Sequence, residues 1–333
     1  MTAAIEPSGS RAAGDGPPSY RPAVAADLEA CAHVWRVSLA GYLEPLGLDH
    51  GLPFDLAPIH RLFGHLLRTD PDRFWVATRP GSGPGDRAPG AGALDGERVV
   101  GFASANVRGR AWFLAMLFVV PGEQGRGIGQ ELLRRAMADT EGMLLGTATD
   151  SAQPISNALY ARLGIVPRVP LLQLAGSVEN AAAIPELQAG VVVDRIDGLA
   201  GDRARDAMAA IDHELLGYEH PADHAFLRDD GRIGFLYSDR AGRPIGYGYA
   251  APVGRIGPVA ALDRAALPAI VGDLLGRVRA NGAQSLRIPG DAPAVVTMLL
   301  RAGFRLESFP VLVAFSEPYA DLARYVPISA ALL

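Results

Sequence analysis

The stretch from Leu114 to Leu133 most constrains what this 333-residue chain can fold into. Seven consecutive apolar residues, Leu114–Val120, predict a strand buried on both faces, and Pro121-Gly122 cannot continue its ladder. A glycine turn, Gln124–Gly129, follows, and apolar spacing then predicts a helix. Glycines let a backbone approach a ligand closely, and the free N–H groups at a helix start favour anions. The turn is therefore expected to hold a pyrophosphate.

A glycine turn alone is also compatible with a tight strand-to-helix connection that binds nothing. The spacing differs from that of a dinucleotide-binding fingerprint, in which the glycines begin directly after the strand. The chain contains no Lys, which excludes a Walker-type nucleotide site. The more specific pattern is Leu-x-Val-x-Pro at 117–121, followed at fixed distance by Gln-x-x-Gly-x-Gly at 124–129. This pattern resembles the acetyl-CoA signature of the GNAT (GCN5-related) N-acetyltransferase superfamily.

A second segment supports the same resemblance. Asn157–Gly164 predicts a short helix closed by glycine, and it is similar to the next conserved GNAT block, with Ile165 in place of the usual Phe. The resemblance covers about Tyr20 to Gly176. It implies an α/β (α+β) fold with a mixed, mostly antiparallel central sheet flanked by helices.

The second half of the chain repeats the first. Three segments recur at a separation of about 140 residues, which indicates a duplicated unit. The matched pairs are Arg98–Phe102 with Arg243–Tyr247, Glu131–Leu133 with Asp273–Leu275, and Arg162–Ile165 with Arg301–Phe304. We therefore expect two tandem GNAT-type domains, 19–176 and 190–333, joined by a linker at 177–189 and preceded by a disordered tail at 1–18.

The chemistry does not recur with the repeat. Opposite the glycine turn lie Ala266, Leu267, Ala269 and Val271, whose side chains occupy the positions of close backbone approach, and opposite Tyr160 lies Leu299. The second domain is therefore expected to have lost acetyl-CoA binding. Packing against the first domain, shaping the acceptor pocket and dimerisation are its expected roles, and a different small-molecule site is the alternative.

The resemblance implies a cofactor site for acetyl-CoA, built from the strand end, the glycine turn and the second block. Its residues are Leu117, Phe118, Val119, Val120, Gln124, Gly125, Arg126, Gly127, Ile128, Gly129, Gln130, Asn157 and Tyr160. The main-chain N–H groups of the turn and of Gln130 would hold the pyrophosphate. The splayed strand end would pair with the pantetheine arm, and the Val119 amide would polarise the acetyl carbonyl.

Three side chains in this set have alternative interpretations. Tyr160 is the candidate catalytic general acid for the CoA thiolate, or an aromatic packed between helix and sheet. Asn157 would contact the cofactor arm or cap its helix. Arg126 would pair with a phosphate or lie in solvent, and Glu123 is expected to face solvent beside the phosphates.

The general base departs from the family pattern. Many GNAT enzymes carry a carboxylate just ahead of Leu-x-Val, whereas this chain has Ala115 and Met116 there. Deprotonation would then use a bound water or a residue of the preceding loop region, and the candidates are Glu44, Asp49, His50 and His60. The expected reaction is acetyl transfer to a primary amine, with aminoglycosides, polyamines, amino acids and protein N-termini all open. A non-catalytic acyl-CoA-binding or scaffold protein is the alternative.

Composition limits the remaining partners. The net charge is −5 and all 31 basic residues are Arg, without a basic block suited to nucleic acid. No apolar run reaches the roughly 20 residues of a membrane helix, so we expect a cytoplasmic protein without membrane contact. The single cysteine, Cys31, excludes an intramolecular disulfide and a Cys-based zinc site, and it is expected in the core. No metal is expected, and a homodimer is suggested by analogy alone.

Overall fold

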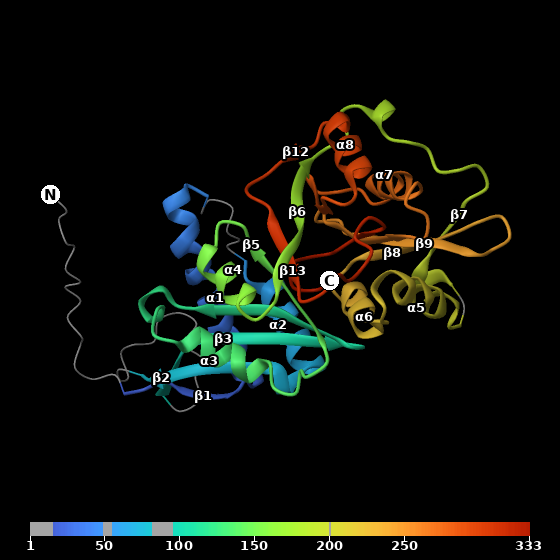
Figure 1. Cartoon of the computed structure of the whole chain (residues 1–333). Coiled ribbons are helices and arrows are strands. Elements are labelled where there is room, and N and C mark those ends of the chain that lie inside the picture. The colour runs from blue at the N-terminus through green and yellow to red at the C-terminus, as the bar shows by residue number, and fades with distance from the viewer. Residues whose placement is uncertain (1–15, 49–54, 82–95, 200) are drawn as a thin grey trace. The chain divides into compact units, whose positions relative to one another are not determined.

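The computed structural model describes residues 16–48, 55–81, 96–199 and 201–333 (Figure 1). The chain forms two compact units of different size, each made of three separate segments. Unit 1 takes Met1–Leu67, Pro71–Ala103 and Leu117–Ala136, and unit 2 takes Arg68–Asp70, Ser104–Met116 and Met137–Leu333. Among the described helices, none combines the length and the apolar character that crossing a membrane requires.

Unit 1 contains the first helices and the edge of a sheet. In chain order the elements that enter it are β1 (Ser19–Pro22), α1 (Leu28–Leu43), α2 (Ala57–Thr69), β2 (Phe74–Pro80), β3 (Glu97–Arg108), β4 (Ala111–Val119) and α3 (Ile128–Ala136). The strands lie in the order β1-β2-β3-β4, and β3 and β4 also run through unit 2.

Aromatic side chains form the centre of unit 1. The rings of Phe63 and Phe74 pack around Phe102, with centroids 5.1 and 5.8 Å from it, and Phe118 stacks on Phe102 at 5.8 Å. Cys31 is fully buried, which confirms its predicted place in the core. This packing fixes the end of β4, where the glycine turn begins.

Unit 2 contains the rest of the described elements, in two sheets. Its strands and helices after β4 are β5 (Leu144–Asp150), α4 (Pro154–Ala161), β6 (Val166–Gly176), β7 (Val192–Arg195), α5 (Arg203–Leu216), α6 (Pro221–Asp229), β8 (Ile233–Ser238), β9 (Pro244–Ala250), β10 (Ile256–Ala261), α7 (Leu267–Arg277), β11 (Gln284–Pro289), α8 (Pro293–Ala302), β12 (Arg305–Leu306), β13 (Val311–Phe315) and β14 (Tyr325–Val326). The smaller sheet has the order β14-β10-β9-β8-β7.

The element order of the second half repeats that of the first, which confirms the predicted duplication and fold class. From β7 to α8 the chain runs strand, two helices, three strands, helix, strand and helix, as it does from β1 to α4. Leu132 and Leu274, matched by sequence, lie on the corresponding helices α3 and α7. Gly164 and Gly303 follow the ends of α4 and α8 with φ of +80° and +112°, a conformation that favours glycine.

The two halves exchange strands. β13, from the second half, pairs antiparallel with β5 on one side and with β6 on the other, while β6 pairs with β11. A cut between residues 176 and 190 would therefore separate paired strands. Sequence similarity between the halves does not indicate which copy a strand pairs with, so the exchange was not predicted. The domain boundaries at 19–176 and 190–333 remain a prediction.

Candidate functional site

The glycine turn in unit 1 has the backbone conformation that only glycine adopts easily. β4 ends at Val119, a short 3-10 turn follows at Pro121–Glu123, and α3 begins at Ile128. Gly125 and Gly127 have φ of +75° and +82°. A β-carbon at either position would meet no described atom within 4 Å. These glycines are therefore required by backbone conformation, not by crowding from protein atoms, and the space beside them is open.

A run of main-chain N–H groups at this turn has no acceptor. The Gln124 N–H donates to Pro121 O at 3.3 Å, and the Glu131 N–H donates to Gly127 O at 3.1 Å. Between them, the N–H groups of residues 125–130 find no backbone or side-chain acceptor among the described residues. Six unpaired donors at the start of α3, where the helix dipole is positive, form an anion-binding feature.

The prediction that the Glu123 side chain faces solvent is wrong. Its side chain is only 7% exposed, and its carboxylate lies 2.9 Å from Nε of the buried Arg79 and accepts from Arg79 Nη2 at 2.9 Å. Arg126, which is 55% exposed, also reaches the Glu123 carboxylate at 3.2 Å. Arg79 is 44 residues away in the chain, so local sequence gave no sign of the pair. Glu123 therefore anchors the turn to β2.

The strand end keeps one main-chain amide directed away from β3. The Val120 N–H donates to Val100 O at 3.0 Å, and because N–H groups alternate sides along a strand, the Val119 N–H points the other way. The Val119 carbonyl, on that same side, accepts from Ser38 Oγ at 3.0 Å and from Gln124 Nε2 at 2.8 Å. The Gln124 side chain thus ties the glycine turn to the strand, a role that the sequence did not indicate.

Within unit 2, β4 and β5 pair only over a short length. The parallel register runs from Ala111 with Leu144 to Leu114 with Thr147, where Thr147 Oγ1 donates to Leu114 O at 3.0 Å. Both strands continue, but the described residues show no further pairing of β4 with β5 beyond this point. An unpaired edge of β4 is suited to an extended ligand arm that makes strand-like hydrogen bonds.

Tyr160 and Asn157 lie on α4, which is docked on the end of β5. Asn157 Nδ2 donates to Asp150 O at 3.1 Å and to Gln153 O at 2.8 Å, so this side chain fixes the helix start to the strand. Tyr160 is buried, and burial raises its pKa despite an opposing hydrogen bond with Thr149. A phenol is protonated at neutral pH even without this shift, so Tyr160 carries the proton that a general acid must donate. Packing and proton donation are compatible at this position.

The candidates for the general base stay unresolved. Ala115 and Met116 are buried on β4, so no carboxylate projects from that segment. Glu44 and His60 are exposed, and Asp49 and His50 lie outside the described residues.

The start of α7, the counterpart of the α3 start, offers fewer N–H groups without an acceptor among the described residues. Of residues 267–272, which lie opposite 125–130, Ile270 donates its N–H to Ala266 O at 3.0 Å. Pro268 has no N–H to offer. Leu299, opposite Tyr160, is fully buried and carries no proton. These contacts favour the prediction that the second half lacks a cofactor site.

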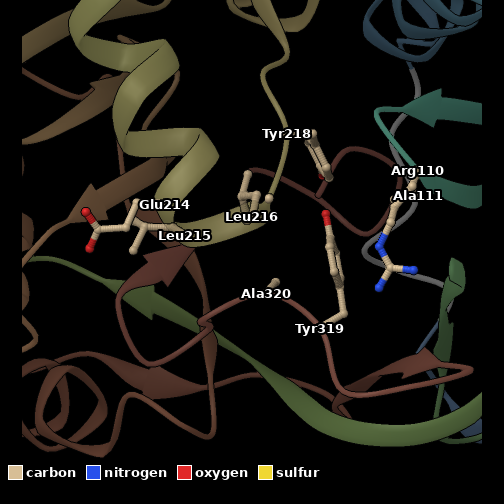
Figure 2. Close-up of a pocket in the computed structure, with 9 residues that line it drawn as sticks. Arg110, Ala111, Glu214, Leu215, Leu216, Tyr218, Tyr319 and Ala320 are labelled. Carbon is tan, nitrogen blue, oxygen red and sulfur yellow. The ribbon is translucent and has the colours of Figure 1, made fainter.

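Unit 2 also has a small cavity beside α5, of about 270 Å³ (Figure 2). Tyr218 and Tyr319 stack on its wall with ring centroids 6.0 Å apart, and Glu214 and Arg110 supply its charges. This volume is at or below the lower limit for drug-sized ligands, so the cavity cannot enclose a cofactor as large as acetyl-CoA.

Sequence reasoning missed a buried polar cluster in the same unit. Asp212 on α5 meets His220 and His224, which stand four residues apart at the start of α6. The spacing of the two histidines by four residues was the available signal, because residues four apart come close together where the chain is helical.

Comparison with known proteins agrees with the predicted fold. Residues 59–165 match the acetyltransferase (GNAT) family model. A Pyrococcus horikoshii protein assigned to the acetyltransferases aligns over 99% of both chains, with 15% identity and a TM-score of 0.70. A GCN5-related N-acetyltransferase of Sphaerobacter thermophilus aligns over 92% of this chain and 98% of its own, with 17% identity and a TM-score of 0.56. At such identities the structural matches establish the fold.

A tandem GNAT protein from the clavulanic acid biosynthesis pathway supports the two-domain architecture. It aligns over 90% of this chain and 99% of its own, with 16% identity and a TM-score of 0.51. No curated protein compared with the sequence gives a significant match.

Proposed function

We propose that this chain, whose residues 59–165 match the acetyltransferase (GNAT) family model, is a tandem GNAT protein that acts as an acetyl-CoA-dependent N-acetyltransferase, with its reaction in the first half. The run of six unpaired N–H groups at residues 125–130 carries this proposal. It supplies donors and a positive helix end where the signature requires the pyrophosphate of acetyl-CoA.

The proposed reaction is direct attack of a neutral amine on the thioester. The amine nitrogen forms a bond to the acetyl carbon, the C–S bond breaks, and the thiolate sulfur takes a proton. The Val119 N–H, which points away from β3, is the proposed donor to the carbonyl oxygen. Tyr160, whose phenol is protonated at neutral pH, is the proposed donor to the sulfur.

The remaining proton leaves the attacking amine. With Ala115 and Met116 in place of a strand carboxylate, a bound water is the proposed acceptor of this proton, or one of the loop-region candidates Glu44, Asp49, His50 and His60. The proposed acceptor substrate is a small primary amine.

The absent strand carboxylate also favours a second candidate, a protein that binds acyl-CoA without catalysis. The two are separated by following thiol release from acetyl-CoA across a panel of polyamines, aminoglycosides, amino acids and peptides. Amine-dependent thiol release that is lost in the Gly127→Arg variant supports the enzyme. Tight CoA binding without thiol release for any amine contradicts the enzyme and supports the scaffold.

A further inference from the structure

The cluster of Asp212, His220 and His224 has the composition of a metal site. One carboxylate oxygen, Asp212 Oδ2, lies 2.8 Å from His224 Nε2 and 3.2 Å from His220 Nε2. Adjacent ligands of a tetrahedral zinc ion stand about 3.3 Å apart, given metal–ligand distances of about 2.0 Å. The three ligand atoms therefore converge at nearly the spacing that a small cation requires.

One atom of the cluster has no hydrogen bond of its own. His220 is 4% exposed, and its Nε2 makes no hydrogen bond among the described residues, although Asp212 Oδ2 lies 3.2 Å away. A buried ring nitrogen whose nearby carboxylate oxygen is not placed for a hydrogen bond calls for an explanation. This one is directed at the point where the other two ligand atoms meet.

The outer contacts orient each of the three side chains. Tyr247 Oη donates to Asp212 Oδ1 at 2.5 Å, and Tyr249 Oη lies 3.1 Å from His224 Nδ1. The Nδ1 atom of His220 lies 3.5 Å from Asp223 Oδ2. Metal-binding histidines usually have such a partner on the second ring nitrogen, which fixes the ring and its tautomer.

The charge around the cluster also favours a dication. Asp223 accepts from Arg108 Nε and Nη2 at 2.9 Å, and Arg108 Nη1 in turn donates to Asp70 at 2.9 Å. Asp223 and Asp70 therefore share the Arg108 guanidinium. The partners of Asp212, in contrast, are the two histidines and Tyr247. A protonated His220 would still leave one negative charge uncompensated, whereas a divalent cation with both histidines neutral balances the group. Buried charge is tolerated when it is paired in this way.

We propose that Asp212, His220 and His224 bind a divalent transition-metal ion, with zinc as the natural probe. The nitrogen and carboxylate donors match its preference. All three side chains are at most 5% exposed, so no substrate reaches the ion, and its role is structural. It joins α5 to α6 independently of the proposed acetyl transfer.

The test is metal binding to the full chain. Protein freed of metal with a chelator is titrated with Zn²⁺ by calorimetry, and thermal unfolding is followed with and without Zn²⁺. We expect one Zn²⁺ per chain and a higher melting temperature. Zn²⁺ that fails to bind, or that binds without raising the melting temperature, overturns the proposal.

Variants locate the ion. His224→Gln should weaken Zn²⁺ binding at least tenfold. Asp223→Asn, which removes the carboxylate beside His220 and also breaks its buried ion pair with Arg108, should weaken it by about 10–100-fold. The matched control is His213→Gln, because His213 is exposed on α5 next to Asp212 and should leave binding unchanged. Equal affinity in His224→Gln and the wild type overturns the assignment.

A second readout covers variants that fail to fold. Co²⁺ added to the metal-free wild-type chain should give the visible absorption bands of a low-coordinate nitrogen and oxygen site. Only the weak spectrum of six-coordinate Co²⁺ would contradict the proposed three-ligand geometry.

Discussion

The two strand-to-helix turns that follow β4 and β10 occupy the same place in the repeated order of elements, yet they differ in the N–H groups and in the glycines that they offer to a phosphate. After β4, residues 125–130 present N–H groups without acceptors, and two glycines have positive φ. After β10, the counterparts are residues 267–272, among which the Ile270 N–H donates to Ala266 O and Pro268 has no N–H. The scaffold is kept in both halves, whereas the glycine turn is kept in one.

Glycines that match between the halves have a different cause from those that do not. A β-carbon at Gly101 would lie 3.0 Å from Phe118 O, and one at Gly246 would lie 2.4 Å from Ala260 O. These two are needed for strand packing, so both halves retain them. Gly125 and Gly127 have no such neighbours and lack counterparts in the second half. Packing therefore explains Gly101 and Gly246, whereas backbone conformation explains Gly125 and Gly127, which border open space.

The largest expected effect concerns the anchor of the first turn. Glu123→Gln leaves the buried Arg79 without its carboxylate and should lower the free energy of unfolding by about 3 kcal/mol. Urea unfolding measures this loss. The control is Glu131→Gln, which removes surface pairs with Arg134 and Arg135 and should cost about 0.5 kcal/mol. Equal losses in the two variants would show that Glu123 does not anchor the turn.

Gly127→Arg should abolish the acetyl-CoA binding that distinguishes the first half from the second. The side chain fills the open approach to the unpaired N–H groups, and losing two charge-assisted hydrogen bonds weakens acetyl-CoA binding more than about 100-fold. Gly142→Arg is the matched control, since Gly142 has φ of +73° and open space but lies after α3. Both variants bear the same backbone strain. Calorimetry should show that acetyl-CoA binding is lost in Gly127→Arg and kept in Gly142→Arg. Acetyl-CoA binding that is retained in Gly127→Arg would contradict the assignment of the glycine turn as the cofactor site.

Tyr160→Phe tests whether Tyr160 donates the proton to the CoA thiolate. The second half has Leu299 at the corresponding position and so lacks this donor. With the phenol gone, kcat should fall about 100-fold, while the affinity for acetyl-CoA stays the same. Steady-state kinetics and calorimetry separate the two quantities. An unchanged kcat would show that Tyr160 contributes to packing and not to proton transfer.

The smallest effect is expected at the second turn. Asp263→Ala removes the acceptor of the Ala265 N–H at the surface and should lower the free energy of unfolding by about 0.5 kcal/mol, with acetyl-CoA binding unchanged. Asp263→Asn, which keeps an acceptor oxygen, is the control in the same unfolding experiment. A change in acetyl-CoA affinity in Asp263→Ala would mean that the second turn takes part in binding.

Local patterns predicted the elements and the first turn well. The apolar run before Pro121 and the glycines after it specify a strand, a turn and a helix through neighbouring residues alone. Contacts between distant residues could not be predicted in this way. The Glu123–Arg79 pair, the insertion of β13 beside β5 and the cluster around Asp212 all depend on tertiary packing.

The central claim is that one half of this duplicated chain binds acetyl-CoA and the other does not. Calorimetric titration of the full chain with acetyl-CoA tests it most directly, because it reads affinity and stoichiometry together. The account predicts one site per chain, lost in Gly127→Arg. Two sites per chain, or no binding at all, would contradict it.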